Sequence, residues 1–145
     1  MNVNLKEVLL TGQIGTFNRA TQIEEVRTQL GDPNDVSRSS KKYKNPVWKY
    51  GYCQIYFFNG LLDHISFYFD EPGLDEQAPI KLDSDFPLFS LTYEKLSSFL
   101  ESENIASHMD YERESSKTYR VGEFTSISFF EDVLSSVVIT PADAP

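Results

Sequence analysis

The second half of the chain repeats the pattern of the first, and this repetition limits the possible folds more than any other feature. When residues 74–145 are laid over residues 1–73 at a shift of 70 to 72 positions, apolar, aromatic and glycine positions coincide along most of the length. The clearest match places Trp48-Lys49-Tyr50-Gly51 on Tyr119-Arg120-Val121-Gly122. Repetition at a fixed period indicates a duplicated structural unit. We therefore expect two tandem similar units, at 1–73 and 74–145, within one compact globule.

Each unit has the pattern of a helix followed by antiparallel strands. In the first unit Thr21 and Glu24 have the spacing of a capping box, and Gly31 ends the apolar stripe of the helix. In the second unit Thr92 is the expected N-cap, and a further short helix is expected at 5–10. The sequence thus predicts an α+β protein, with a helix or helix pair on a three- to four-stranded antiparallel sheet in each unit. Strands are expected at 47–52, 54–58, 62–69, 117–121, 124–130 and 134–140.

The hairpin turns predict which strand residues face the core. A two-residue turn at Asn59-Gly60 would pair residues of opposite parity, whereas a three-residue loop with a glycine bulge pairs residues of like parity. Only the longer loop gathers the apolar odd-numbered residues on one face. We therefore expect the odd face to be the core, covered by the helix of each unit. The even face then carries Tyr56, Phe58, Leu62, His64, Ser66 and Tyr68 in the first unit, and Ser126, Ser128, Phe130, Leu134, Ser136 and Val138 in the second.

Composition excludes several classes of protein. The chain has 145 residues, 40% of them hydrophobic and 14% aromatic, which is enough to build a core and unlike a disordered chain. No apolar run approaches the roughly 20 residues that cross a bilayer. The first ten residues lack the pattern of a secretion signal, and Cys53 is the only cysteine. We therefore expect a cytoplasmic protein without disulfides and without a membrane partner.

The negative charge belongs to one half of the sequence. Residues 1–73 contain eight basic and eight acidic residues, whereas residues 74–145 contain five basic and fourteen acidic ones, so 5 minus 14 accounts for the whole net charge of -9. A net negative chain repels phosphate, which makes nucleic acid an unfavourable partner for the protein as a whole. An acidic surface on the second unit could steer a basic protein partner.

The sequence lacks the motifs of catalysis and of cofactor binding. It contains no glycine-rich phosphate loop, nucleophile elbow or dinucleotide fingerprint. Cys53 and His64 are expected on opposite faces of the sheet, where they could not act as nucleophile and base. His64 and His108 lie in different units, without acidic residues at the spacing of metal ligands. We expect a protein that is not an enzyme and that holds neither a cofactor nor a metal.

Two surfaces are candidates for binding. The candidate partner-binding residues are Tyr56, Phe58, His64, Tyr68 and Trp48. If exposed, the aromatic even face would be a larger apolar patch than a monomer normally tolerates, so we expect the second unit, a second copy of the chain or another protein to cover it. The other surface is the basic loop 38–49, where lysines beside aromatic rings could contact phosphates and stack on bases. Its candidate anion-binding residues are Arg38, Lys41, Lys42 and Lys44.

The run Thr21–Pro33, followed by the strand Trp48-Lys49-Tyr50, resembles the helix-to-strand motif of small bacterial modules related to the beta-lactamase inhibitory protein and to the small lipoprotein of the outer-membrane assembly machine. The resemblance implies tandem helix-plus-sheet units that bind a target enzyme across a concave sheet. The present sequence differs in lacking a lipidation cysteine near its start and stabilising disulfides. The strand Trp48-Lys49-Tyr50-Gly51 before a hairpin also resembles uncharacterised bacterial cytoplasmic proteins that look like immunity proteins.

Together these patterns predict a non-enzymatic protein–protein interaction module of the immunity or inhibitor type. The expected partner is a protein, with a toxin, an enzyme or a second copy of the chain as candidates. The alternative hypothesis is an anion- or nucleic-acid-binding regulator that uses the basic loop 38–49. A small-ligand site in the cleft between the two units is a third hypothesis, because junctions between units form clefts.

Overall fold

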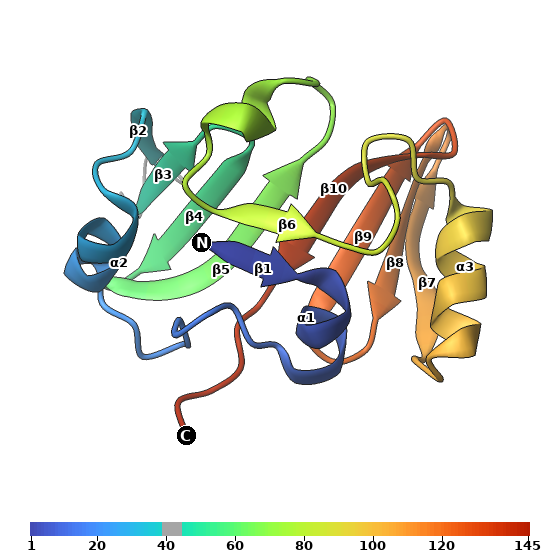
Figure 1. Ribbon diagram of the computed structural model, residues 1–145, viewed down its shortest axis with the longest axis horizontal. Coiled ribbons are helices and arrows are strands. Elements are labelled where there is room, and N and C mark those ends of the chain that lie inside the picture. The colour runs from blue at the N-terminus through green and yellow to red at the C-terminus, as the bar shows by residue number, and fades with distance from the viewer. Residues whose placement is uncertain (39–44) are drawn as a thin grey trace.

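The protein is an α+β structure built on a large antiparallel sheet. The structure, a computed structural model, describes residues 1–38 and 45–145. Within these residues there are three α-helices, one 3-10 helix and two sheets (Figure 1). The helices are α1 Leu5–Thr11, α2 Ile23–Leu30, η1 Leu74–Gln77 and α3 Tyr93–Ser102.

The strands of the large sheet lie in the order β2-β3-β4-β5-β10-β9-β8-β7, with every neighbouring pair antiparallel. A second, two-stranded sheet pairs β1 with β6 in parallel. The strands are β1 Asn2–Asn4, β2 Asp35–Arg38, β3 Pro46–Tyr50, β4 Cys53–Phe58, β5 Leu61–Tyr68, β6 Lys81–Asp83, β7 Ser107–Arg113, β8 Ser116–Val121, β9 Thr125–Phe130 and β10 Val133–Ile139.

The helices begin near the predicted positions, with one correction. Thr92 caps α3 as expected, because its hydroxyl oxygen accepts a hydrogen bond from the Lys95 amide at 3.4 Å. The capping box of α2 was predicted one residue too early. It is formed by Gln22 and Glu25, whereas Thr21 is buried and its hydroxyl accepts a hydrogen bond from the Asn18 amide.

The odd-numbered face is the core, as predicted, but the predicted turn is wrong. Asn59-Gly60 is a two-residue turn with positive φ at both residues, and the pair Phe58 and Leu61 closes it. Asp63 is an extra, unpaired residue between the pairs Phe57 with Leu62 and Tyr56 with His64. Beyond this bulge, residues of like parity pair, as predicted. As a consequence, Leu62 shares a face with Phe57 and is buried in the core, not on the even face.

The β9–β10 hairpin is built in the same way. Glu131 and Asp132 both have positive φ, and Ser135 is the unpaired residue. Leu134 therefore pairs with Phe129 and is buried, which corrects the prediction that placed it on the even face.

Four strands were not predicted, and each lacks an apolar pattern of its own. β1, β2 and β6 have three or four residues, too few for a periodic signal. β7 is an edge strand in which all seven residues are exposed, so its sequence has no buried face to display. The 3-10 helix η1 lies at the boundary between the two expected units, 1–73 and 74–145.

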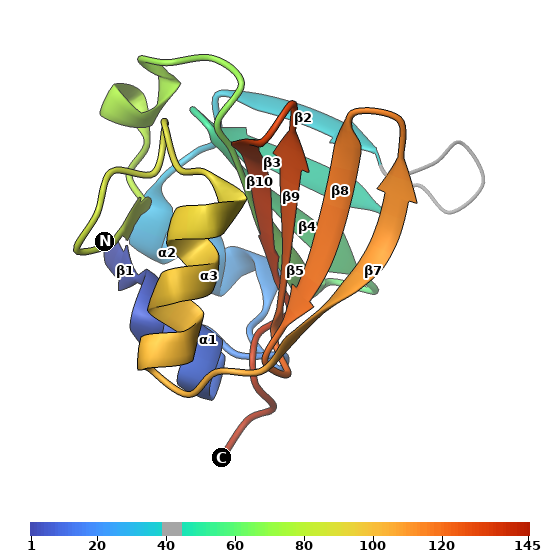
Figure 2. The ribbon, with the colours of Figure 1, turned by 90° about the vertical axis from the view of Figure 1, so that its right-hand side faces the viewer.

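All of the described α-helices lie on one side of the large sheet, and the edge strand β7 bends away from them (Figure 2). The core fills the space between this helix layer and the odd face of the sheet. Its fully buried side chains include Ile55, Ile65, Phe67, Leu96 and Ile139. Within the described residues, no helix is both long enough and apolar enough to cross a membrane.

The first residues of the chain pack against its second half. β1 pairs with β6, and Lys6 of α1 forms an ion pair with Glu103 at 2.9 Å. The carbonyl oxygen of Leu9 lies so close to Gly122 that a Cβ atom at Gly122 would stand 2.7 Å from it.

Gly51 and Gly122 occupy matching places after β3 and β8, and both have positive φ, at 60° and 62°. The Leu74 carbonyl oxygen approaches Gly51 as that of Leu9 approaches Gly122. We expect Gly51→Ala and Gly122→Ala each to lower the free energy of unfolding by about 3 kcal/mol or more, because alanine adds a backbone clash to left-handed strain. Urea denaturation measures the loss.

Gly60→Ala is the matched control for the two glycine variants. Gly60 also has positive φ but has no atom within 4 Å of an added Cβ, so we expect a loss of only about 1–2 kcal/mol from left-handed strain. Equal losses for all three variants would contradict the importance of the close carbonyl contacts.

Two buried tyrosines make the fold sensitive to alkaline pH. The Tyr50 hydroxyl donates a hydrogen bond to the Gly31 carbonyl at 2.8 Å, and the Tyr52 oxygen accepts one from the Leu82 amide at 2.8 Å. Burial raises the pKa of each phenol from 10.0 to about 12. A phenol whose pKa is raised in the folded state stabilises the fold fully below its unfolded pKa and loses that contribution as the pH rises.

We therefore expect the free energy of unfolding to decline as the pH rises from about 10 to about 12. Urea denaturation at fixed pH values, followed by circular dichroism, measures this decline, and tyrosinate absorbance reports the ionisation. Tyr50→Phe is expected to make the decline shallower. A free energy of unfolding that stays constant across this pH range would contradict the prediction.

Candidate functional site

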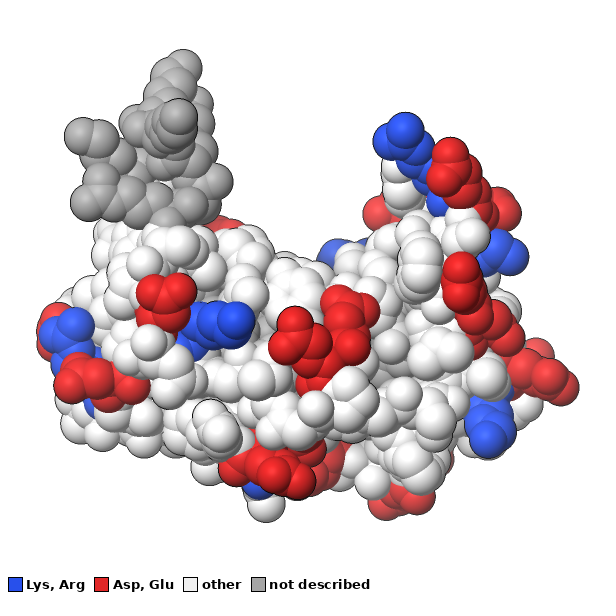
Figure 3. All heavy atoms as spheres, turned by 90° about the horizontal axis from the view of Figure 1, so that it is seen from above, with Lys and Arg blue, Asp and Glu red and all other residues white. Residues whose placement is uncertain are grey.

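The first candidate site is the open face, defined as the face of the large sheet opposite the helix layer, against which none of the described helices packs. It is the face that carries the even-numbered residues of β4 and β9. The predicted residues Tyr56, His64 and Tyr68 lie on it together, and Phe58 lies at its rim beside the β4–β5 turn. In the view from above, the β7–β8 hairpin at the right projects past the body of the molecule, and the surface is hollowed beside it (Figure 3). The sheet is thus concave on this side.

Tyr56 and His64 form a rigid pair on the open face. Their rings stack with centroids 4.1 Å apart and planes 16° from parallel, since the two residues are direct cross-strand partners. His64 Nδ1 lies 2.7 Å from Oδ2 of Asp63, the extra residue of the bulge. The bulge therefore places a carboxylate beside the imidazole and fixes the orientation of the ring.

The Tyr56 hydroxyl links this pair to Tyr68. It donates a hydrogen bond to Oε1 of Gln54 at 3.0 Å, and the Tyr68 hydroxyl lies 3.2 Å away. Burial raises the pKa of Tyr56, and the hydrogen bond with Tyr68 raises it further. The phenol stays neutral, and Tyr56, His64 and Tyr68 form a continuous aromatic strip, hereafter the aromatic strip.

Beside the aromatic strip the open face is made of small hydroxyl residues. Along one row of the register, Tyr68 lies opposite Ser136, Ser136 opposite Ser128, and Ser128 opposite Thr118. The hydroxyls of Thr118 and Ser128 are hydrogen-bonded at 2.8 Å. Sequence patterning placed these serines on the even face but did not include Thr118, because β8 had no turn signal to set its parity.

Apolar side chains are exposed at two corners of the open face. Phe58 and Leu61 are 54% and 40% exposed beside one turn, and Phe130 and Val133 are 52% and 42% exposed beside the other. These turns precede β5 and β10, which are antiparallel, so the two apolar pairs lie at opposite ends of the central strands. Tyr111 on β7, 52% exposed, is the cross-strand partner of Thr118.

Trp48 does not belong to this surface, contrary to the prediction. It is 3% exposed, lies on the core face opposite Ile55, and packs edge-on against Phe57 at 5.0 Å. The guanidinium of Arg27 covers its ring at 4.9 Å from the centroid. The face on which Trp48 lies depends on how β3 pairs with β4. The sequence around Trp48 does not determine that pairing.

The predicted anion-binding residues fall at the edge of what the structure describes. Lys41, Lys42 and Lys44 lie outside the described residues. Arg38 ends β2, and its side chain is also outside the described part. In the described register, the basic side chains on the open face are Lys49, Arg113 and Arg120, with Asp35 directly opposite Lys49.

Cys53 lies on the core face, and His64 lies on the open face. Cys53 is fully buried, and burial raises the pKa of its thiol. The two side chains are thus separated by the sheet, as the parity argument predicted. Among the described residues, no group of three or more His, Cys, Asp and Glu side chains could hold a metal ion.

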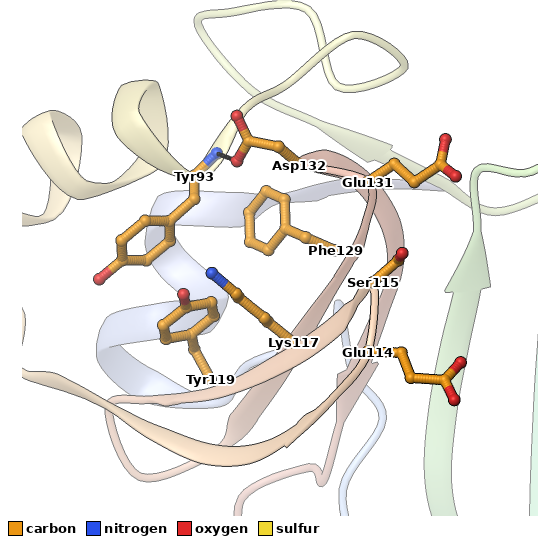
Figure 4. Close-up of a pocket in the computed structure, with 8 residues that line it drawn as sticks. All are labelled: Tyr93, Glu114, Ser115, Lys117, Tyr119, Phe129, Glu131 and Asp132. Carbon is orange, nitrogen blue, oxygen red and sulfur yellow. Dashed lines mark hydrogen bonds between the residues drawn. The ribbon is translucent and has the colours of Figure 1, made fainter.

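The second candidate site is a cavity between the start of α3 and the β7–β8 and β9–β10 turns, with a volume of about 350 Å³ (Figure 4). Tyr93 stacks on Tyr119, with centroids 4.1 Å apart, and Phe129 packs edge-on against both rings. Sequence reasoning missed this site because its residues come from three separated segments. The lining residues are Tyr93, Glu114, Ser115, Lys117, Tyr119, Phe129, Glu131 and Asp132.

Comparison of the chain with models of protein families, with curated proteins and with solved structures finds no significant match. The function is therefore argued from the geometry of the two candidate sites.

Proposed function

We propose that this protein is a non-enzymatic interaction module that binds a protein partner across the open face. The observation that carries the proposal is the distribution of exposed apolar side chains. Among the described residues, nine large hydrophobic side chains are exposed, and five of these nine lie on the open face: Phe58, Leu61, Tyr111, Phe130 and Val133. Exposed apolar side chains gathered on one face are typical of interaction sites.

The aromatic strip suits the centre of such an interface. Tyrosine rings bury a large area at little conformational cost, and their hydroxyls can bond to a partner. Tyr56 and His64 are already held by stacking, so their ordering costs little on binding. The neighbouring row of serines and Thr118 offers small hydrogen-bonding groups that let a convex surface approach the sheet closely.

The charges on the open face favour a foreign protein over a second copy of the chain. Lys49, Arg113 and Arg120 lie in register on this face. Two copies docked through it would bring like charges together, whereas a partner with acidic groups around an apolar centre would complement them. An enzyme or toxin neutralised by an immunity- or inhibitor-type protein is a partner of this kind, and the resemblance of the sequence to such modules supports the same proposal.

We expect a photoreactive amino acid at position 58 to crosslink a specific protein in cells of the native host, and the same group at position 10 not to do so. Phe58 and Leu10 are matched in exposure, at 54% and 53%, but Leu10 lies on α1 in the helix layer. Mass spectrometry of the adducts is the measurement. Leu61→Asp, at an exposed position, is expected to abolish the adduct of position 58 without unfolding the chain.

Three outcomes would overturn this proposal. The first is no adduct from position 58, and the second is the same set of adducts from both positions. The third is an adduct of twice the chain's mass formed by the purified protein alone, which would identify a second copy as the partner.

The alternative, an anion- or nucleic-acid-binding regulator, is favoured by the same three basic side chains, because they lie together on one face of the sheet. Titration of labelled single-stranded DNA and RNA at low salt separates the two functions. We expect no saturable binding, since the net charge of -9 repels phosphate even where electrostatic attraction is strongest. Saturable binding that weakens with salt would favour the alternative.

We also propose that the chain consists of two tandem units, near 1–73 and 74–145. The proposal is supported by Gly51 and Gly122, which share positive φ and a close carbonyl contact, and by hairpins with an unpaired residue at matching places. The single buried cysteine fits a reducing compartment, so we propose that the protein acts in the cytoplasm.

A further inference from the structure

The cavity beside α3 lies on the helix side of the large sheet, away from the open face, and its chemistry is distinct. Its volume of about 350 Å³ falls within the roughly 300–1,000 Å³ of sites for small molecules. Three aromatic rings, those of Tyr93, Tyr119 and Phe129, form its apolar wall. Burial raises the pKa of the Tyr119 phenol, which favours its neutral form.

The charged groups around the wall are mostly acidic. Glu114 comes from the β7–β8 turn, and Glu131 and Asp132 from the β9–β10 turn, against one basic residue, Lys117. The lining therefore has a formal excess of two negative charges, three minus one. Aromatic faces and carboxylates both attract cations, so the two parts of the cavity favour the same kind of ligand.

Lys117 is the basic residue that the chain itself contributes to the cavity. Its side chain lines the cavity and, in Figure 4, is directed toward the side where Tyr93 and Tyr119 stand. Its nitrogen is also 4.0 Å from Oε1 of the cross-strand residue Glu112, and both side chains are about half exposed. Lys117 can therefore turn toward Glu112 without leaving its charge unpaired.

An anion is the less suitable ligand, although α3 begins here. The first amide of the helix, that of Tyr93, already donates a hydrogen bond to Oδ1 of Asp132 at 3.4 Å (Figure 4). The position that would attract an anion at a helix N-terminus is thus taken by a carboxylate of the chain itself.

We propose that this cavity binds a cationic group, an ammonium or guanidinium on an aliphatic stem. The stem packs against the ring of Tyr93, the cation takes the place of the Lys117 ammonium, and Asp132 balances its charge, while Glu131 on the same turn adds to the negative field around the cavity. Such a cationic group on an aliphatic stem is present both in the lysine and arginine side chains of a peptide and in a free amine. The cavity and the open face lie on opposite sides of the sheet. Loss of cation binding in the cavity would therefore not affect binding of a protein to the open face, and the two proposals can be tested separately.

The experiment uses the whole protein labelled with nitrogen-15 and records amide chemical shifts during three titrations. The probes are acetyl-arginine-amide, agmatine as the free amine, and acetyl-citrulline-amide, which has nearly the shape of the first without its charge. We expect acetyl-arginine-amide to shift the amides of Tyr93, Lys117 and Tyr119 in a saturable way, and acetyl-citrulline-amide to leave them unchanged. Binding of agmatine as well would identify a free amine as an equally suitable source of the cation.

Two variants test the roles of the charges. Lys117→Met keeps the aliphatic stem and removes the competing ammonium, so we expect acetyl-arginine-amide to bind about fivefold or more tightly. Glu131→Gln keeps the shape of an exposed side chain and is expected to weaken binding about fivefold. Leu10→Met, on the exposed side of α1, is the control that should change neither value.

The proposal is overturned if no probe shifts the cavity amides in the parent protein or in Lys117→Met. It is equally overturned if acetyl-citrulline-amide binds as tightly as acetyl-arginine-amide, or if Lys117→Met weakens binding. In the last case Lys117 would be a ligand for an anionic group and not a stand-in for a cation.

Discussion

The pairing of β5 with β10 is the interaction on which the rest of the structure depends. The two strands lie at the centre of the large sheet, and their register aligns Ile65 with Ile139 and Phe67 with Val137. All four side chains are at most 1% exposed, so they join the strands on either side into one core. Because side chains alternate between faces, a slip of one residue in this register would turn the core residues of one half outward. The same register sets Tyr68 beside Ser136 on the open face.

The β4–β5 and β9–β10 turns determine which residues face the core at the outer ends of these strands. Each turn has two residues with positive φ, and each is followed by an unpaired residue, Asp63 or Ser135, that restores the alternation. Between turn and bulge the parity is reversed, which buries Leu62 and Leu134 and leaves Phe58 and Phe130 on the open face. The bulges thus create both the apolar corners of the candidate interface and the position of Asp63 beside His64.

The helix layer gives the two faces of the sheet different roles. With α1, α2 and α3 on one side, the odd face is closed to solvent, and the open face is free to present the aromatic strip and the row of serines (Figure 2). The cavity beside α3 lies at the margin of the helix layer (Figure 4). Its aromatic wall lies between the N-terminus of α3 and the β7–β8 and β9–β10 turns. The proposed protein-binding face and the proposed cation site therefore lie on separate surfaces around one small core.

The sequence alone determined the class of fold, the two main helices and the strands with buried faces, because their apolar periodicity is local. It also determined that Ile55, Phe67, Ile127 and Ile139 share the core, since alternation and parity suffice for residues away from the turns. It could not determine β7, which has no buried face, or the burial of Leu62, Leu134 and Trp48, which depends on bulges and register. Tertiary structure alone decided that Tyr56, His64 and Tyr68 touch, and that Tyr93, Lys117 and Phe129 surround one cavity. These contacts join segments that only the pairing of strands and the packing of α3 bring together.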